Sequence, residues 1–277
     1  MSSELAGQSA VVVGGASGIG AGIVRALVAR GASVDIADRD IDGSQALADT
    51  LNAAGAEVTA SFVDITKSET LDSFARDVRG RRAEIGLLFA NAGALALKPF
   101  VEATEEDWRW LLDTNVVGTA NTVRAFLPDL LNQTRRSRVA ITSSISILRS
   151  PDMIGQSLYV ASKAAQFGMC TALEAELADT NVALSIIFPG PVKTSLGAKS
   201  IVARPESVQL SVPVSASLGM ISGDEAGERI ILDILAGRRF ITTHPDEKSR
   251  VASKFAEIMQ AFDPLRGAGC EVEGAIQ

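Results

Sequence analysis

The sequence predicts an α/β protein built on a doubly wound parallel sheet. Short β-branched runs alternate with longer helical patterns from the N-terminus to about Phe188, which is typical of this class. The run 10–13 is apolar throughout, as expected for a parallel strand covered on both faces. No Pro/Ser-rich linker interrupts the alternation, so we expect a single domain over residues 1–277.

Each element follows from its local pattern. Thr104, with acidic residues in the turn that follows it, predicts a capped helix start, and Asp246 is expected to cap the last helix. After Pro189 the alternation breaks, and residues 195–222 are rich in Ser, Val and Ala without sustained periodicity. The Gly-rich tail, 265–277, is expected to fray. The expected strands are 10–13, 33–38, 58–64, 85–89, 138–142, 182–188 and 240–243; the main expected helices are 20–30, 41–54, 115–128, 159–179 and 225–236.

Composition excludes several function classes. A single histidine, His244, and two distant cysteines, Cys170 and Cys270, exclude a zinc site of Cys and His, so we expect no metal. The same counts make Ser-His-Asp catalysis a weak hypothesis, and we expect a structural or interface role for His244. The net charge of −7 disfavours a nucleic-acid surface. The N-terminus lacks a secretory pattern and no apolar run approaches the about 18 residues that span a bilayer, so we expect a cytoplasmic protein without membrane contact.

A glycine-rich turn follows the first strand. Gly14, Gly18 and Gly20, with Ser17 and Ile19 between them, stand where the chain must turn sharply into a helix. Without side chains at these positions, a diphosphate can approach the backbone N–H groups at the positive end of the helix. The spacing is GxxxGxG, and its position directly after a buried strand indicates a dinucleotide-binding turn.

An acidic residue ends the second strand. Asp38 stands about 20 residues after the turn, where a carboxylate accepts hydrogen bonds from both hydroxyls of an adenosine ribose. It would repel a ribose 2′-phosphate, and Ser17 places no cation in the turn, so we expect NAD as the cofactor. Arg39 leaves NADP open, because an arginine beside the ribose can clasp a phosphate. An ordinary strand-end cap is the alternative interpretation of Asp38.

The only tyrosine lies one helical turn before a lysine. Tyr159 and Lys163 share a helix face at a spacing of four residues. A free phenol has a pKa of about 10 and is a poor base near neutrality unless positive charge stabilises the phenolate, which Lys163 would supply. A chance pair on a solvated face is the alternative.

Together these motifs resemble the short-chain dehydrogenase/reductase family, over most of the chain to about Thr194. The resemblance implies a Rossmann fold, with Tyr159 as general acid/base, Lys163 on the nicotinamide ribose, a serine hydroxyl on the substrate oxygen and Asn115 holding a proton-relay water. It also implies homotetramers or homodimers packed through the helices of Asn115 and Tyr159. The cofactor-binding residues implied are Gly14, Ser17, Gly18, Ile19, Gly20, Asp38, Arg39, Asp64, Ile65, Asn91, Ala92, Gly93, Tyr159, Lys163, Pro189, Gly190, Val192 and Thr194.

The sequence departs from the family pattern in two places. Val13 and Ala90 stand where the family has Thr and Asn, which puts hydrogen bonds between the first and fourth strands in question. Ser143, Ser144 and Ser146 all lie near the end of the fifth strand. Strand alignment favours Ser144 as the catalytic hydroxyl, with Ser143 as the runner-up, and the alternative for either is a hydroxyl that caps the strand end.

The segment 195–222 follows Thr194, where relatives cover their substrate. Its apolar composition predicts a hydrophobic secondary alcohol or ketone as substrate, aromatic ones included, although packing on the protein or a partner subunit would use the same residues. A second resemblance, through 189–194 and 243–245, is to bacterial dehydrogenases of bulky aryl carbinols. The alternative function is a nucleotide-sensing regulatory protein on the same fold. An epimerase or dehydratase of nucleotide sugars ranks last.

Overall fold

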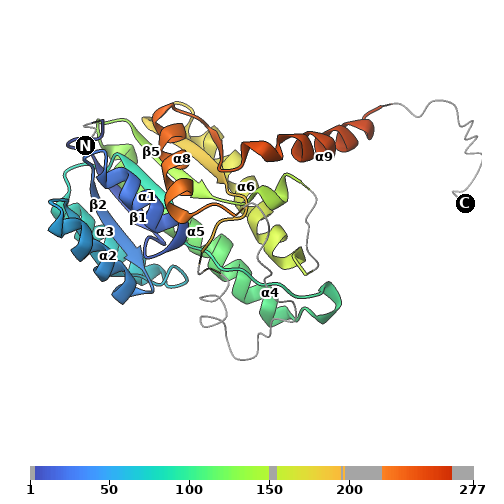
Figure 1. Ribbon diagram of the computed structural model, residues 1–277, viewed down its shortest axis with the longest axis horizontal. Helices are drawn as coiled ribbons and strands as arrows, with labels where there is room; N and C mark the ends of the chain where they lie inside the picture. The colour runs from blue at the N-terminus through green and yellow to red at the C-terminus, as the bar shows by residue number, and fades with distance from the viewer. Residues whose placement is uncertain (1–3, 150–154, 195, 197–219, 264–277) are drawn as a thin grey trace, which may run out of the picture.

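The structure is a computed structural model that describes residues 4–149, 155–194, 196 and 220–263. Within these ranges seven strands pair in parallel in the order β3-β2-β1-β4-β5-β6-β7. The predicted doubly wound α/β fold is therefore confirmed (Figure 1). The strands are β1 Ser9–Val13, β2 Ser33–Asp38, β3 Val58–Phe62, β4 Leu87–Ala90, β5 Ser137–Thr142, β6 Val182–Phe188 and β7 Phe240–Thr242.

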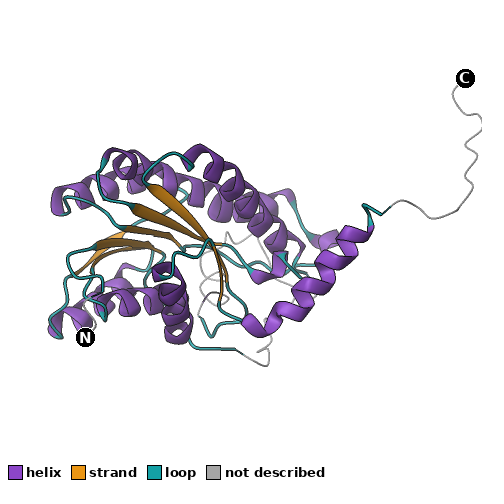
Figure 2. Cartoon of the chain, turned by 90° about the horizontal axis from the view of Figure 1, so that it is seen from above, coloured by secondary structure: helices purple, strands orange, loops and turns teal. Residues whose placement is uncertain are grey.

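Helices cover both faces of the sheet, which explains the unbroken apolar run of β1 (Figure 2). Val11 and Val13 point into a core shared with Phe74 and Phe126, whereas Val12 points into the opposite core with Leu27. The first core packs under α3 (Ser68–Arg81), α5 (Gly118–Asn132) and α6 (Ser157–Leu177). The second packs under α1 (Gly18–Val28), α2 (Ile41–Ala53) and α8 (Gly223–Leu235).

The helix before the site differs from the expectation. Instead of starting near Asn115, a helix begins as α4 (Glu105–Leu112), passes through a π-turn at η2 (Asp113–Val117) and continues into α5. The expected end at Pro128 is also wrong, because Pro128 lies inside α5. The residue four before it, Arg124, is exposed, so a carbonyl that loses its helical donor there can be hydrated. The capping box at Thr104 forms as predicted.

The C-terminal part of the described chain holds a second correction. Pro245–Glu247 forms a short 3-10 turn, and α9 (Lys248–Gln260) follows it. Asp246 therefore lies within the turn and does not cap the helix; Glu247 occupies that place without a side-chain cap bond. The tail 265–277, and 195–222 apart from Leu196 and 220–222, lie outside the described residues. In the described chain no helix is long and apolar enough to cross a membrane.

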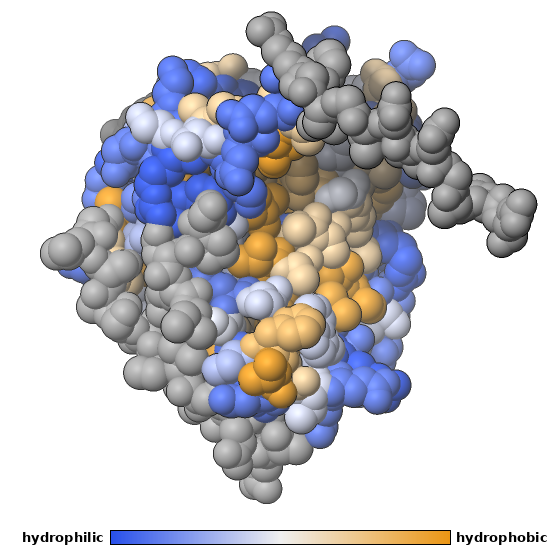
Figure 3. Space-filling view, turned by 90° about the vertical axis from the view of Figure 1, so that its right-hand side faces the viewer, coloured by the Kyte–Doolittle hydropathy of each residue, from blue (hydrophilic) through white to orange (hydrophobic). Residues whose placement is uncertain are grey.

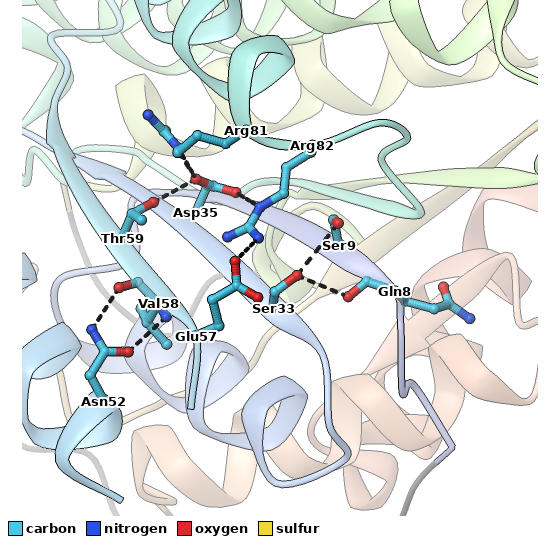
Figure 4. A network of polar contacts seen from close by, with 10 residues as sticks. All are labelled: Gln8, Ser9, Ser33, Asp35, Asn52, Glu57, Val58, Thr59, Arg81 and Arg82. Atoms are coloured by element: carbon cyan, nitrogen blue, oxygen red, sulfur yellow. Dashed lines mark hydrogen bonds and ion pairs between the residues drawn. The ribbon is translucent and has the colours of Figure 1, made fainter. Parts of the chain in front are cut away.

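One buried charge lies in the middle of β2. The Asp35 side chain is fully buried and bonds to the guanidinium groups of Arg81 and Arg82 at the end of α3, and to the Thr59 hydroxyl of β3 (Figure 4). Arg82 also pairs with Glu57. A buried carboxylate without partners would destabilise the fold, so Asp35 requires these arginines. The ion pairs in turn hold the end of α3 against the sheet.

Candidate active site

The glycine-rich turn brings three chain segments into close contact. Gly14 and Gly18 have positive φ values of 85° and 55°, which other residues rarely adopt. A Cβ added at Gly14 would lie 2.5 Å from the backbone of Ala92, and one at Gly18 would lie 2.7 Å from the Thr194 side chain. Glycine at these two positions therefore lets the turn pack directly against Ala92 and Thr194 at the carboxyl edge of the sheet, where α1 begins.

Asn91 joins the ends of three neighbouring strands. Its amide nitrogen donates to the carbonyl of Gly14 over 2.8 Å, and its amide oxygen accepts from the Thr142 hydroxyl over 3.1 Å. The backbone N–H groups of Asn91 and Ala92 both donate to the Val13 carbonyl. Although Val13 and Ala90 stand where the family has Thr and Asn, hydrogen bonds at Asn91 still connect the first and fourth strands.

Asp38 contacts the glycine-rich turn directly. Its carboxylate accepts from the backbone N–H groups of Ala16 and Asp40, each over 3.0 Å. The neighbouring Arg39 is half-exposed and directs its guanidinium toward Asp64, with a nearest N–O distance of 3.9 Å. A carboxylate, and not a cation, thus lies against the turn at the end of β2.

Tyr159 and Lys163 lie on the same face of α6, as predicted. The Lys163 ammonium lies 5.9 Å from the centre of the Tyr159 ring and donates to the Thr142 carbonyl over 2.9 Å. Burial lowers the pKa of Lys163 to about 7, because the charged form loses its hydration. Burial also raises the pKa of Tyr159, and a hydrogen bond with Ser144 opposes that rise.

The two serines at the end of β5 point to different partners. The Ser143 hydroxyl donates to the backbone carbonyl of Lys163 over 2.9 Å and is buried. The Ser144 hydroxyl bonds with Tyr159 and also accepts from the hydroxyl of Ser146 over 2.8 Å. Of the two, only Ser144 is in contact with the tyrosine oxygen.

Asn115 lies in the π-turn and is fully buried. Its side chain accepts from the Ala94 N–H over 2.7 Å and donates to the hydroxyl of Ser162, which in turn donates to the Tyr159 carbonyl. Its backbone carbonyl accepts from the Gln166 amide over 2.6 Å and from Thr119 over 2.7 Å. Asn115 thus connects the loop after β4 to the helix of Tyr159.

The loop after β6 is held by the last strand. The Gly190 N–H donates to the Thr243 hydroxyl over 3.2 Å, and a Cβ at Gly190 would lie 2.5 Å from the His244 ring. His244 is buried, and its Nδ1 lies 2.8 Å from the Thr243 hydroxyl in a hydrogen bond. Val192 pairs with Ile221 in a parallel bridge, which joins this loop to the residues just before α8.

Most of the predicted residues lie along the carboxyl edge of the sheet. The side chain of Ile65 does not, and three residues that were not predicted also contribute: Ser162, Gln166 and Lys193. Ile65 is buried against Gly118, so its side chain belongs to the core. Ser162 and Gln166 were not foreseen, because their polar contacts depend on how α6 faces the π-turn. Lys193 was also missed, although a cation inside a cofactor-lining motif is a usable signal. A hollow of about 330 Å³ beside the turn is lined by Ala16, Ser17, Gly18, Ala21, Arg25, Lys193, Gly223 and Asp224.

A parallel sheet in this strand order, with a glycine-rich turn after its first strand, defines a Rossmann fold. The sequence profile of the short chain dehydrogenase family matches residues 8–204. The chain belongs to this family, the short-chain dehydrogenases/reductases, as its motifs predicted. It is therefore an oxidoreductase that acts on CH–OH groups with a nicotinamide dinucleotide.

Individual relatives agree with this assignment. The chain is 30% identical over 254 residues to the 1-deoxy-11-beta-hydroxypentalenate dehydrogenase of Streptomyces avermitilis, which covers 91% of this chain and 90% of that protein. A short-chain dehydrogenase/reductase from Burkholderia phymatum in complex with NAD is 28% identical, with a TM-score of 0.84 over 96% of this chain and 99% of that one. An alcohol dehydrogenase from Thermococcus sibiricus complexed with 5-hydroxy-NADP is 25% identical, with a TM-score of 0.70 over 85% and 94%. None of these similarities supports the alternative of a nucleotide-sensing protein.

Proposed function

We propose that this protein is an NAD-dependent dehydrogenase of hydrophobic secondary alcohols and ketones, aromatic ones included. The observation that carries the proposal is the contact of Ser144 with Tyr159 beside the buried Lys163 ammonium. This group of residues can hold a substrate oxygen and move a proton to or from it.

The shape of the carboxyl edge fits a dinucleotide. Side chains at positions 14 and 18 would collide with Ala92 and Thr194, so only glycine allows this close turn, and a Cβ at Gly93 would lie 3.3 Å from the Lys163 ammonium. We assign the diphosphate to the turn of Gly14, Ser17, Gly18, Ile19 and Gly20, with Lys193 as an added cation. The remaining contacts are assigned to Asp38, Arg39, Asp64, the backbone of Ile65, Asn91, Ala92, Gly93, Tyr159, Lys163, Pro189, Gly190, Val192 and Thr194.

The charge at the end of β2 supports NAD over NADP. Asp38 lies against the turn through the Ala16 N–H, so its carboxylate would meet the ribose hydroxyls and repel a 2′-phosphate. Arg39 points toward Asp64 and is not directed at that position. Similar proteins occur with both cofactors, the Burkholderia phymatum protein with NAD and the Thermococcus sibiricus protein with 5-hydroxy-NADP, so the proposal of NAD rests on Asp38.

Each residue of the site has its own role in the proposed reaction. Bound NAD supplies the acceptor for the hydride that leaves the carbinol carbon. The Tyr159 phenolic oxygen takes the proton of the substrate hydroxyl, and Ser144 donates a hydrogen bond to the same substrate oxygen. Because burial alone disfavours the phenolate, the Lys163 ammonium and the Ser144 hydrogen bond are needed to stabilise it. Asn115 acts by holding the loop of Ala94 against α6.

The apolar composition of the segment after Thr194 supports a hydrophobic substrate. Next to the site, Tyr159, Trp108 and Trp110 pack on a buried apolar cluster of Ala94, Ala96, Leu111 and Leu158. We assign the apolar segment 195–222 to the cover of the substrate, and the relative from Streptomyces avermitilis is likewise a dehydrogenase of a hydroxy compound.

A kinetic panel tests the proposal. We expect kcat/KM with NAD to exceed that with NADP, and 1-phenylethanol-type alcohols to exceed sugars and 3-hydroxyacyl thioesters. Asp38→Ala should shift the preference toward NADP, whereas Asp42→Ala, which removes an exposed carboxylate from α2, should leave it unchanged. A wild-type preference for NADP, or a tenfold advantage of a sugar or thioester, would overturn the respective half of the proposal.

A further inference from the structure

A second serine lies directly beside the hydroxyl of Ser144. Ser146 belongs to η3 (Ile145–Ile147), the short 3-10 turn that follows β5. Its backbone N–H donates to the Ser144 oxygen over 3.2 Å, and its hydroxyl donates to the same oxygen over 2.8 Å. On its other side the Ser144 hydroxyl bonds with Tyr159. Ser146, Ser144 and Tyr159 therefore form a chain of three hydroxyl groups.

The hydrogen-bonding capacity of a hydroxyl fixes the direction of this chain when Tyr159 is ionised. A serine hydroxyl has one proton to donate and two lone pairs that accept. A phenolate oxygen only accepts, so Ser144 must donate its proton to it. Both lone pairs of the Ser144 oxygen then remain for Ser146, whose N–H and O–H fill them. In the ionised state every bond of the chain thus points toward Tyr159.

The chain of hydroxyl groups is shielded from water. Ser144 and Ser146 are 7% and 8% exposed, Ile145 between them is buried, and Ile147 packs on the core. Lys254 of α9 donates to the Ile147 carbonyl over 3.3 Å, so the base of α9 lies against η3. Figure 3 views the end of the molecule from which α9 projects, and apolar residues gather across this face. Hydrogen bonds are stronger in surroundings of low dielectric constant and polarise one another, so Ser146 can act on a charge that lies one hydroxyl away.

We propose that Ser146 is a positioning residue for the reaction, whose hydroxyl holds the Ser144 proton toward the Tyr159 oxygen and so stabilises the ionised form of the tyrosine. The inference rests on the proposed function for the role of Tyr159 as the base. The hydrogen bonds themselves are a property of the folded protein and can be tested without turnover.

The same segment also has a purely structural contact. The Ser144 side chain occupies the N-cap of η3 and accepts from the Ser146 N–H, as serine does at the start of many helical turns. This cap needs only the N–H of Ser146, and the bond from the Ser146 hydroxyl is additional to it. Ser146→Ala therefore keeps the cap and removes the bond on which the proposal depends.

Lys163 is the charged residue that contacts Tyr159 in the part of the chain that the structure describes. Its ammonium lies 5.9 Å from the centre of the tyrosine ring, whereas Trp108 and Trp110 of α4 share an apolar cluster with that ring. Charged residues on the neighbouring segments are paired with one another: Lys98 with Asp107, and Arg149 with Glu247. The variants below leave Lys163 unchanged, so its effect on the phenol is common to all the proteins compared.

Tyr159 is the only tyrosine of the chain, so its ionisation can be measured directly. Incorporation of difluorotyrosine during expression labels this position alone, and the fluorine atoms acidify the phenol so that it ionises where the fold is stable. Fluorine NMR then follows the titration in protein without substrate or dinucleotide. Ser146→Ala should raise the pKa of the labelled phenol, and its ionisation constant should fall about three- to tenfold, as expected for the loss of one net hydrogen bond.

Two further variants show whether Ser146 acts through Ser144. Ser144→Ala should raise the pKa of the phenol at least as much, and adding Ser146→Ala to it should cause no further change, because the connecting hydroxyl is gone. The control is Ser137→Ala, which removes a buried hydroxyl from the opposite end of β5 and should leave the titration unchanged. An unchanged or lower pKa in Ser146→Ala, or an equal effect of Ser146→Ala with and without the Ser144 hydroxyl, overturns the proposal.

Kinetics separate this inference from the proposed function. In alcohol oxidation with NAD, Ser146→Ala should lower kcat at neutral pH and approach the wild-type kcat as the pH rises, because the phenolate then forms in both proteins. A reduction of kcat that is equal at every pH would mean that Ser146 acts on the fold alone, and overturns the inference. If no alcohol is oxidised while the titrations turn out as expected, the proposed function fails and the role of Ser146 in stabilising the phenolate stands.

Discussion

The side-chain amide of Gln166 donates to the backbone carbonyl of Asn115 over 2.6 Å and so joins α6 to the π-turn. Gln166 is fully buried, and both of its amide hydrogens are used, by Asn115 and by Thr119. Its carbonyl oxygen has no partner in the described chain. The contact thus depends on an amide donor, and a carboxylate of the same size cannot replace it.

The first prediction follows from this contact. Gln166→Leu should lower the free energy of unfolding by about 1–3 kcal/mol, the usual cost of removing one partner from a buried hydrogen bond. Gln166→Glu should be less stable than Gln166→Leu at pH 8, because its carboxylate would face a carbonyl. At pH 5, protonation of the introduced carboxyl group should reduce the difference in unfolding free energy between the two variants. Urea unfolding at both pH values measures it; equal stability of the two variants at pH 8 would show that the contact does not need a donor.

The second prediction concerns proton transfer. Tyr159→Phe should lower kcat by about 10²–10⁴-fold while the Kd for NAD stays within a few-fold, because the phenol moves a proton and contributes little to holding the dinucleotide. Steady-state kinetics and fluorescence titration with NADH provide the two measurements. A Phe variant that retains substantial turnover would remove Tyr159 from the acid/base role.

The third prediction separates the two serines. Ser144→Ala should reduce kcat/KM by about 10²–10³-fold, because it removes the hydroxyl that contacts Tyr159. Ser143→Ala removes a bond to the Lys163 backbone and should act mainly on stability, by about 1 kcal/mol. Both variants are assayed side by side with thermal melts. A larger catalytic loss in Ser143→Ala would exchange the two assignments.

The fourth prediction uses the lowered pKa of Lys163, about 7. The unfolded chain holds a proton on this lysine up to its ordinary pKa of about 10.4, whereas the folded chain without bound dinucleotide loses it above about pH 7, so the stability of the dinucleotide-free protein rises with pH between these values. Between pH 7 and 9 this one group adds on the order of 2 kcal/mol.

Lys163→Met removes this dependence. In protein without added dinucleotide, the stability of wild type relative to Lys163→Met should therefore increase from pH 7 to pH 9. Denaturant unfolding of both proteins at each pH gives the difference. A constant difference across this range would mean that Lys163 is protonated throughout it in the folded state.

Much of the fold and of the candidate site could be predicted from the sequence, because the signals are local. The unbroken apolar run of β1 and the glycines after it indicate a covered parallel strand and a tight turn. Tyr159 and Lys163 share a face because helix geometry fixes residues four apart. Strand topology then brings the ends of β1, β2, β4, β5 and β6 to one edge of the sheet, together with the residues that follow each strand.

What could not be predicted depends on which side chains meet across elements. Asp35 is a charged residue in an otherwise apolar strand. Its burial is explained by ion pairs with Arg81 and Arg82 of α3, which the sequence pattern does not reveal. The choice between Ser143 and Ser144 depends on the direction in which each hydroxyl points, which the spacing to Tyr159 does not determine. Pro128 predicted a helix end from a local rule, and its position on the solvent side overrides that rule.

The bonds that Asn91 makes have a consequence for ligand binding. Asn91 already connects Gly14, Thr142 and Val13 by hydrogen bonds. The carboxyl edge of the sheet is therefore ordered before a dinucleotide binds. The conformational entropy of these loops is lost during folding, so dinucleotide binding does not have to pay that cost a second time. Preorganisation of this kind couples two properties that are usually measured apart: a change that loosens the strand ends should weaken the affinity for the dinucleotide even when no atom that touches it has been altered.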